Sequence, residues 1–274
     1  MVAPGTPRRH GCEAPLHPSQ IAVVGVALLS AVVFYAFSVQ ELPVLMQRTV
    51  LPLYSVQFAI TALLFVVISR FDPGQPRHQA THPSQSSGQT DDAQVTVAIA
   101  AVGVVKAAPN IKASSELFSS HPVVAKCRDC GRAALTPDTR HCSRCNKCIP
   151  GYDHHCTYLN TCIGTRNYPL FVGLLSCSIL LLVTQQIVTG YAVSCLLASG
   201  QDNDKNSRAV MLCVLSVLPL LELFFLVVLG TFHLYIASQG LTTYEWLYQW
   251  LEGRNPSDTS SMEANTAERS RTPL

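Results

Sequence analysis

The sequence predicts an α-helical polytopic membrane protein with four transmembrane helices and a cytosolic, cysteine-rich domain between helices 2 and 3. Two observations carry this prediction. Of the 274 residues, 48% are hydrophobic and only 13% are charged, whereas roughly a quarter of a soluble domain is charged. Seven of the eleven cysteines lie between Cys127 and Cys162. We therefore expect apolar helices that lie in lipid, joined to one short segment rich in thiols.

Four apolar stretches reach the length of about 20 residues that a helix needs to cross the hydrocarbon layer. They are residues 21–39, 51–69, 168–197 and 209–237. The first stretch resembles a cleaved signal peptide, but it is long and a second stretch follows it closely, so we expect it to be retained. An even number of spans places both termini on the same side of the membrane.

The remaining segments are expected on the cytosolic side. They are a mobile N-terminal tail (1–20), a partly disordered linker (70–126), the cysteine-rich domain (127–167) and a C-terminal segment (238–274). A cluster of reduced thiols belongs in a reducing compartment. These segments also hold most of the Lys and Arg residues, as cytosolic segments tend to do.

The cysteine-rich segment has the ligand types and spacings of zinc sites. Two closed tetrahedral sites need eight ligands, and the segment offers seven cysteines and three histidines, so two groups are left over. In an extended segment alternate side chains point to opposite faces, which puts His154 and Cys156 on one side and His155 on the other. Asp153 would need a local turn to reach His154. A thiol beside an imidazole is an activated nucleophile, so this segment can carry chemistry.

Ligand counting by itself leaves alternatives open. The segment can be a purely structural zinc knuckle in which Cys156 is a spare thiol. A RING-type cross-brace fits less well, because the final Cys-x2-Cys pair of that module is absent. Hydrolysis by a zinc-bound water would require one site to lack a protein ligand.

The run Asp-His-His-Cys at 153–156, followed by Cys162 and by Asn167-x3-Phe171, resembles the DHHC-type protein S-acyltransferases, or palmitoyltransferases. The resemblance implies two structural Zn²⁺ ions, each held by four ligands. It assigns them to Cys127, Cys130, His141 and Cys148 for one ion, and to Cys142, Cys145, His155 and Cys162 for the other.

The resemblance leaves Asp153, His154 and Cys156 free of metal and implies a reaction for them. A long-chain fatty acyl group, such as palmitoyl, would pass from acyl-CoA to Cys156 and then to cysteine thiols of substrate proteins. His154 would handle protons, and Asp153 would fix the tautomer of His154. Zinc would serve only to hold the loop.

The chain departs from the family pattern beside the tetrapeptide. Thr157-Tyr158 stands where the family commonly has Pro-Trp, and Thr161 stands where it has a second Asn. A catalytically impaired, DHHC-like membrane adaptor with a purely structural zinc domain is therefore the alternative function. Such an adaptor would keep the zinc ligands but would need neither His154 nor Cys156.

Two further motifs flank the spans. Asp72-Pro73-Gly74 has the composition of a turn, and we interpret it as a structural hinge. Thr242-Thr243-x-Glu245 follows the last span, and Thr242 with Glu245 has the pattern of a helix capping box. The resemblance implies that one threonine of this TTxE-like motif supports Asp153, and we assign that role to Thr243.

Three smaller features complete the prediction. Asn167 and Pro169 indicate the start of the third helix. Trp246 and Trp250 lie on one face of a short helix that we expect against the lipid headgroups. His233, near the end of the fourth span, is expected at the membrane interface rather than among ligands.

The partners follow from the same arguments. They are acyl-CoA, the lipid bilayer and membrane-associated proteins with cytosolic cysteines. The net charge of +2 is too small to indicate nucleic-acid binding. We expect an internal membrane, of the Golgi or the endoplasmic reticulum, or the plasma membrane.

Overall fold

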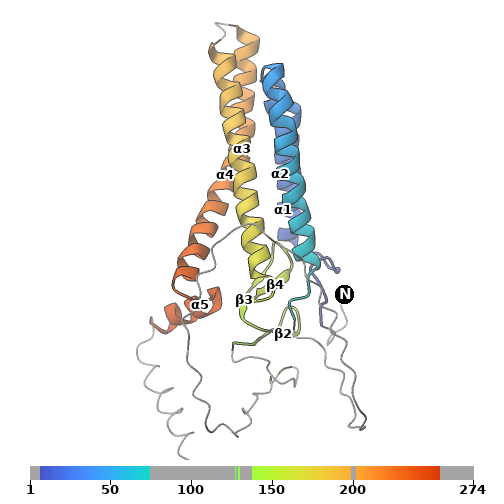
Figure 1. Ribbon diagram of the computed structural model, residues 1–274, viewed down its shortest axis with the longest axis vertical. Coiled ribbons are helices and arrows are strands. Elements are labelled where there is room, and N and C mark those ends of the chain that lie inside the picture. The colour runs from blue at the N-terminus through green and yellow to red at the C-terminus, as the bar shows by residue number, and fades with distance from the viewer. Residues whose placement is uncertain (1–6, 75–126, 128, 130–137, 199–201, 254–274) are drawn as a thin grey trace, which may run out of the picture. The chain divides into compact units, whose positions relative to one another are not determined.

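The computed structural model describes residues 7–74, 127, 129, 138–198 and 202–253. Most of the linker (75–126), Cys130 and the end of the C-terminal segment lie outside these described residues. Within them the chain forms five α-helices and four short strands (Figure 1).

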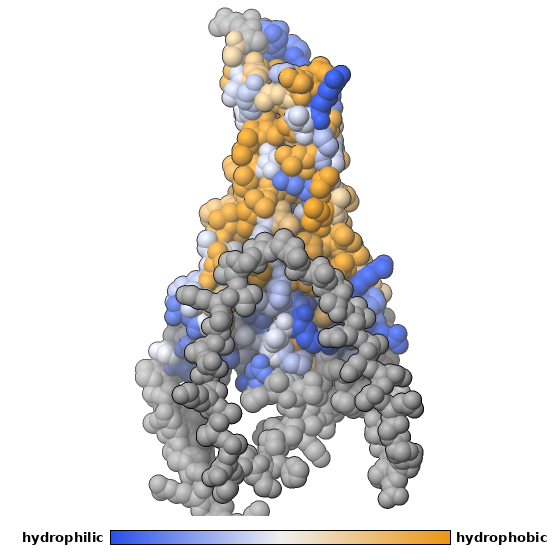
Figure 2. All heavy atoms as spheres, in the orientation of Figure 1, coloured by the Kyte–Doolittle hydropathy of each residue, from blue (hydrophilic) through white to orange (hydrophobic). Residues whose placement is uncertain are grey.

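Four of the described helices are long and apolar enough to cross a membrane. Helix α1 (Pro18–Val33) continues through a π-helical turn and a 3₁₀ turn to Glu41, and α2 follows at Val44–Arg70. The other two are α3 (Tyr168–Ala198) and α4 (Asn203–Ser238). Apolar side chains cover the helices on the face drawn in Figure 2. The predicted fold class, a four-helix membrane protein with a cysteine-rich domain between helices 2 and 3, is confirmed.

The helix ends are set by polar residues. The side chain of His17 accepts a hydrogen bond from the backbone N–H of Ser19 at the start of α1, at 3.1 Å. Helix α4 begins before residue 209 because Asp202 caps it and accepts a hydrogen bond from the backbone N–H of Asp204. Its first polar turn is held to the end of the α1 span by an ion pair of 2.9 Å between Arg208 and Glu41. Capping thus extends the helix beyond its apolar part.

The cysteine-rich domain contains two antiparallel hairpins. Strand β1 (Arg140–Cys142) pairs with β2 (Lys147–Ile149), and β3 (Tyr152–Cys156) pairs with β4 (Thr161–Gly164). Isolated two-stranded hairpins are at best marginally stable in water. The small core that these hairpins share, with Ile149 among its members, consists largely of cysteine side chains.

A buried asparagine joins the second hairpin to the membrane. Asn167 accepts a hydrogen bond from the backbone N–H of Gly164 and donates one to the carbonyl oxygen of Cys162, at 2.9 and 3.0 Å. The same residue accepts the hydrogen bond of the Phe171 backbone N–H in the first turn of α3. The cysteine-rich domain is therefore tied directly to the start of α3.

Within the helix bundle, polar side chains form hydrogen bonds between neighbouring helices. The hydroxyl of Tyr54 in α2 donates to the side-chain oxygen of Gln185 in α3 at 3.0 Å. The amide nitrogen of Gln185 donates to the carbonyl oxygen of Ser30 in α1, also at 3.0 Å. One side chain of α3 thus joins three helices at a depth where water is scarce.

Replacing Gln185 should destabilise the bundle. In Gln185→Ala the buried hydroxyl of Tyr54 loses its acceptor, and we expect the free energy of unfolding in detergent to fall by about 1–2 kcal/mol. Thr184→Ala is the matched control, because Thr184 is only partly buried and its hydroxyl bonds within its own helix. Equal stability of the two variants would contradict a three-helix role for Gln185.

Candidate active site and metal centres

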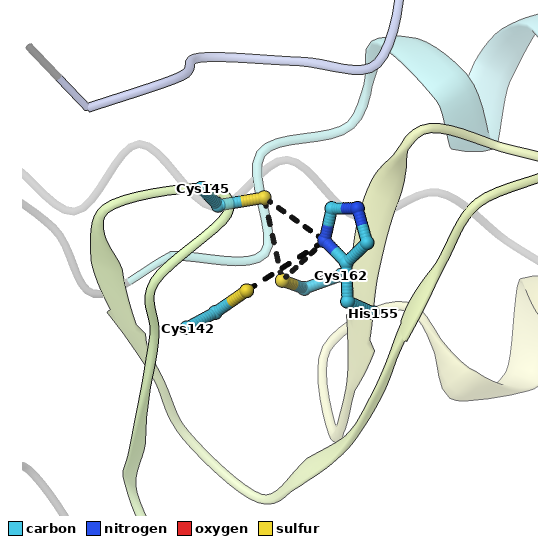
Figure 3. A group of neighbouring side chains, drawn as sticks. All are labelled: Cys142, Cys145, His155 and Cys162. Atoms are coloured by element: carbon cyan, nitrogen blue, oxygen red, sulfur yellow. Dashed lines mark hydrogen bonds between the residues drawn. The ribbon is translucent and has the colours of Figure 1, made fainter. Parts of the chain in front are cut away.

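One group of metal-ligating side chains comes from both hairpins and the turn of the first. The sulfurs of Cys142, Cys145 and Cys162 lie 3.3–3.6 Å from Nδ1 of His155 (Figure 3). The sulfurs of Cys162 and Cys145 are 3.4 Å apart. Metal bonds of about 2.3 Å to sulfur and 2.0–2.1 Å to nitrogen would give tetrahedral edges of about 3.5–3.8 Å. The donor set and its geometry therefore fit a closed zinc site.

A second group contains Cys127, His141 and Cys148, whose ligand atoms lie within 4.8 Å of one another. The register of β1 and β2 places His141 opposite Cys148. Cys130, the fourth ligand that the resemblance implies, lies outside the described residues. Three neighbouring donors of these types also fit zinc.

Side-chain alternation explains how one hairpin serves two groups. His141 and Cys142 are neighbours in β1, so their side chains point to opposite faces. His141 joins Cys148 in the second group, and Cys142 joins Cys145 in the first. A pair of short strands thus supplies ligands to both groups without a larger scaffold.

The same alternation separates His155 from Cys156 in β3. His155 lies opposite Cys162 of β4, within the first metal group. Cys156 is buried instead among Ile68 of α2 and Phe171 of α3. The ring of His154 meets the ring of Phe171 edge-on, with centroids 5.4 Å apart. The structure therefore places His154 and Cys156 on the face that the metal groups do not use.

A β-bulge brings Asp153 to His154. Tyr152 pairs with Gly164 and His154 with Ile163, so Asp153 is an extra residue without a partner across the hairpin. Bulges of this kind turn a side chain away from its regular direction. The result is a 2.6 Å hydrogen bond between Oδ2 of Asp153 and Nδ1 of His154. The bulge provides the local turn that the sequence analysis found necessary.

The first residue of α5 (Thr243–Glu252) completes the surroundings of Asp153. The backbone N–H of Thr243 donates to Oδ1 of Asp153 at 2.9 Å, and its hydroxyl donates to Oδ2 at 2.8 Å. Thr242 caps the helix and forms the expected capping box with Glu245. Thr242 thus caps the helix, and Thr243 donates hydrogen bonds to Asp153. A carboxylate at a helix N-terminus is also favoured by the helix dipole.

These contacts determine the charges of the pair. Burial alone would raise the pKa of Asp153, but the hydrogen bonds from His154 and Thr243 lower it below its usual value. Burial would likewise lower the pKa of His154, but its bond to Asp153 and its neighbour Cys156 raise that pKa to about 9. The pair is therefore a carboxylate beside an imidazolium at neutral pH.

His233 of α4 is a member of this site that the sequence analysis missed. We expected it at the membrane interface rather than among ligands, and in the structure its side chain is 4% exposed. Its Nδ1 lies 3.3 Å from the hydroxyl of Tyr168, and its ligand atom is within 4.8 Å of those of Asp153 and His154. The available signal was its rarity, since histidines within spans usually have a function. Both carboxylate oxygens of Asp153 already accept hydrogen bonds, so we interpret this group as a polar network.

Comparison with known proteins agrees with this geometry. Residues 124–249 match the model of the DHHC palmitoyltransferase family. The chain belongs to the DHHC family. Its relatives include probable protein S-acyltransferase 1 of Arabidopsis thaliana, 31% identical over 73% of this chain and 57% of the relative. Palmitoyltransferase ZDHHC5-A of Danio rerio is 37% identical over 43% of this chain and 15% of the relative.

A third relative, probable protein S-acyltransferase 20 of Arabidopsis thaliana, is 23% identical over 88% of this chain and 43% of the relative. The chain spans about half the length of the curated relatives that head the comparison. The residues that match the family contain the four strands, α3, α4 and most of α5.

Adjacent histidines of the DHHC domain should differ in their effect on metal content. We expect His155→Ala to lose about one zinc ion of two, because it removes a ligand from a closed site. His154→Ala is the matched control and should keep both ions, since its ring faces Phe171. Elemental analysis of the purified variants measures this, and zinc loss in His154→Ala alone would contradict the assignment.

Proposed function

We propose that this DHHC chain is a protein S-acyltransferase that uses an acyl-Cys156 intermediate. The acyl group is a long-chain one such as palmitoyl, the donor is acyl-CoA, and the acceptors are cysteine thiols of membrane-associated proteins. The observation that carries the proposal is the position of Cys156. Its thiol is outside both metal groups, follows a hydrogen-bonded Asp153–His154 pair, and packs against residues of α2 and α3.

The proposed reaction has two transfers. In the first, the Cys156 thiolate attacks the carbonyl carbon of the acyl-CoA thioester, the C–S bond to CoA breaks, and His154 gives its proton to the departing thiolate. In the second, His154 accepts the proton of the acceptor thiol, whose sulfur then attacks the acyl-Cys156 thioester. Cys156 leaves as the thiolate, so the enzyme returns to its starting state.

Asp153 has a positioning role in both transfers. Its bond to Nδ1 of His154 leaves the other ring nitrogen for the reacting sulfur. The two hydrogen bonds from Thr243 fix the carboxylate itself. The proton carrier is therefore held by a chain of contacts that ends in α5.

The surroundings of Cys156 suit an amphipathic donor. The apolar cluster around its sulfur contains Ile68, near the end of α2, and Phe171, in the first turn of α3. An acyl chain attached there can enter the apolar region between helices, while the CoA part stays in water. We place the DHHC domain and both termini in the cytosol, in an internal membrane of the Golgi or endoplasmic reticulum or in the plasma membrane.

Two Zn²⁺ ions are the cofactors that the metal groups fit. The first group supplies four protein ligands, Cys142, Cys145, His155 and Cys162. Cys127, His141 and Cys148 supply three for the second, with Cys130 proposed as its fourth. Closed sites of this kind stabilise a fold and leave no position for substrate. The chemistry is thus assigned to Cys156 and His154.

Labelling with a fatty acyl-CoA tests this function. We expect purified wild-type protein to take up labelled palmitate from palmitoyl-CoA in a form that hydroxylamine releases, because a thioester is cleaved by that reagent. Cys156→Ser should take up none, and Cys177→Ser, a cysteine of α3 outside both metal groups, should behave as wild type. If zinc-loaded wild type fails to label, or Cys156→Ser labels equally, the chain is better described as a membrane adaptor.

The contact between Thr243 and Asp153 gives a separate prediction. Thr243→Val removes one of the hydrogen bonds to Asp153 and should slow acyl transfer about fivefold to tenfold, corresponding to about 1–1.4 kcal/mol. Thr243→Ser keeps the hydroxyl and should restore the wild-type rate. Single-turnover rates of acyl-Cys156 formation measure both. Equal rates for the valine and serine variants would exclude a role for the hydroxyl.

A further inference from the structure

Residues 7–17, which precede α1, lie along the DHHC domain and are here named the N-terminal strap. We expected a mobile tail, but backbone hydrogen bonds hold this segment. The N–H of Arg8 donates to the carbonyl oxygen of Cys145 at 2.9 Å. The N–H of Gly11 donates to the carbonyl oxygen of Ser69, at the end of α2, at 2.6 Å. The strap therefore bridges the first metal group and the second spanning helix.

The strap also contacts the turn that directly follows Cys156. Residues 157–160 connect β3 to β4, and Asn160 ends this turn with a positive φ of 54°. Its side-chain nitrogen donates to the carbonyl oxygen of Gly11 at 3.0 Å and lies 3.4 Å from that of Pro15. Asn160 is only 4% exposed. A buried amide from the turn is thus satisfied by the strap.

Gly11 fits this position because it has no side chain. A methyl group added there would overlap the carbonyl oxygen of Leu159 and lie 3.1 Å from that of Ser69. Both neighbours are backbone atoms, which cannot move aside as a flexible side chain can. At Gly11 the backbone of the strap therefore packs directly against the backbone of the turn after Cys156 and of the end of α2.

A buried lysine fixes the other side of the strap. The ammonium of Lys147, in β2, donates to the carbonyl oxygen of Arg9 at 3.1 Å and pairs with Asp72 at 2.5 Å. Asp72 belongs to the Asp-Pro-Gly motif, whose Gly74 packs closely on the Lys147 side chain. The Asp-Pro-Gly motif, which we interpreted as a hinge, thus binds the lysine that hydrogen-bonds to the strap.

The turn contains no proline, so no ring locks its backbone φ. Its Leu159 is 2% exposed and packs in the same apolar cluster as Cys156. The exposed Tyr158 lies at its tip, and the buried hydroxyl of the neighbouring Thr161 finds no hydrogen-bond partner among the described residues. Besides the packing of Leu159, the backbone next to Cys156 is restrained by the hydrogen bonds of Asn160 and by the close approach of Gly11.

We propose that the N-terminal strap positions the nucleophile, and that Gly11 and Asn160 are positioning residues for acyl transfer. The proposal rests on the proposed function, because it assigns the strap a role in placing the Cys156 sulfur relative to His154 and to the acyl-CoA carbonyl. Misplacement of a reacting group by about 1 Å can lower a rate on the order of 100-fold. The strap acts through the turn and does not touch the reacting atoms.

Two variants and one control test the strap. Gly11→Ala introduces the overlap with Leu159. Asn160→Asp keeps the size and the tolerance for positive φ but cannot donate to Gly11 and Pro15. Cys12→Ser is the control, since Cys12 is the exposed neighbour of Gly11. Each variant is compared with wild type for zinc content, hydrogen exchange of the amides of residues 157–161, and single-turnover acylation by palmitoyl-CoA.

We expect both strap variants to keep their zinc, to exchange the turn amides at least tenfold faster, and to acylate Cys156 about tenfold to 100-fold more slowly at saturating palmitoyl-CoA. The palmitoyl-CoA concentration at half-maximal rate should stay the same, because binding of the donor is not affected. Cys12→Ser should match wild type in all respects.

Other results would overturn the proposal. Exchange and acylation equal to those of Cys12→Ser would show that the strap does not hold the turn. Zinc loss in both strap variants would show a general structural role instead. If wild type takes up no acyl group, the proposed function fails, and the exchange rates alone then decide whether the strap holds the turn.

Discussion

The alternation of side chains along β3 is the constraint on which the rest of the site depends. A single strand of five residues carries His155, a member of the first metal group, between two residues proposed for chemistry, His154 and Cys156. Because neighbouring side chains point to opposite faces, the strand can be fastened to a metal group on one face and leave a thiol and an imidazole on the other. A one-residue slip of the β3–β4 register would exchange the two faces, so the pairing of His155 with Cys162 also determines the face on which Cys156 lies.

Asp153 connects this strand to the helices. It lies in a bulge, where it can accept hydrogen bonds from its own neighbour and from the N-terminus of α5. The linker between α4 and α5 is only a few residues long, so the position of α4 also restricts α5. His233, on the same helix, reaches the pair from the membrane side. A carboxylate buried this deeply stays ionised because His154 and the N-terminus of α5 supply it with hydrogen-bond donors and a positive charge.

The sequence was sufficient for features that depend on composition and spacing. The four spans follow from uninterrupted apolar length, and the capping box of α5 follows from the spacing of Thr242 and Glu245. Within the described residues, the side chains that the family resemblance assigned to each metal group lie together, although their roles and that of Cys156 remain predictions. Features that depend on tertiary contact were not accessible. The bulge at Asp153 is visible only in the pairing register, His233 is identified only by how the helices pack, and the strap has a polar composition that does not reveal its hydrogen bonds.

Metal binding would stabilise the inside of the DHHC domain, whereas contacts with the helices and the strap determine its position. Isolated hairpins of this size are at best marginally stable in water. Zinc bound at the two groups would stabilise their internal structure. Zinc does not determine where the hairpins lie relative to the membrane, however, because all the ligands that the structure describes belong to the domain itself. That placement comes from Asn167 at the start of α3, from Thr243 at the start of α5, and from the strap beside α2. The proposed reaction needs Cys156 at the boundary where an acyl chain enters lipid and CoA stays in water. It follows that loss of the contacts made by Asn167, Thr243 or the strap can lower the rate of the proposed acyl transfer even when both metal sites are intact.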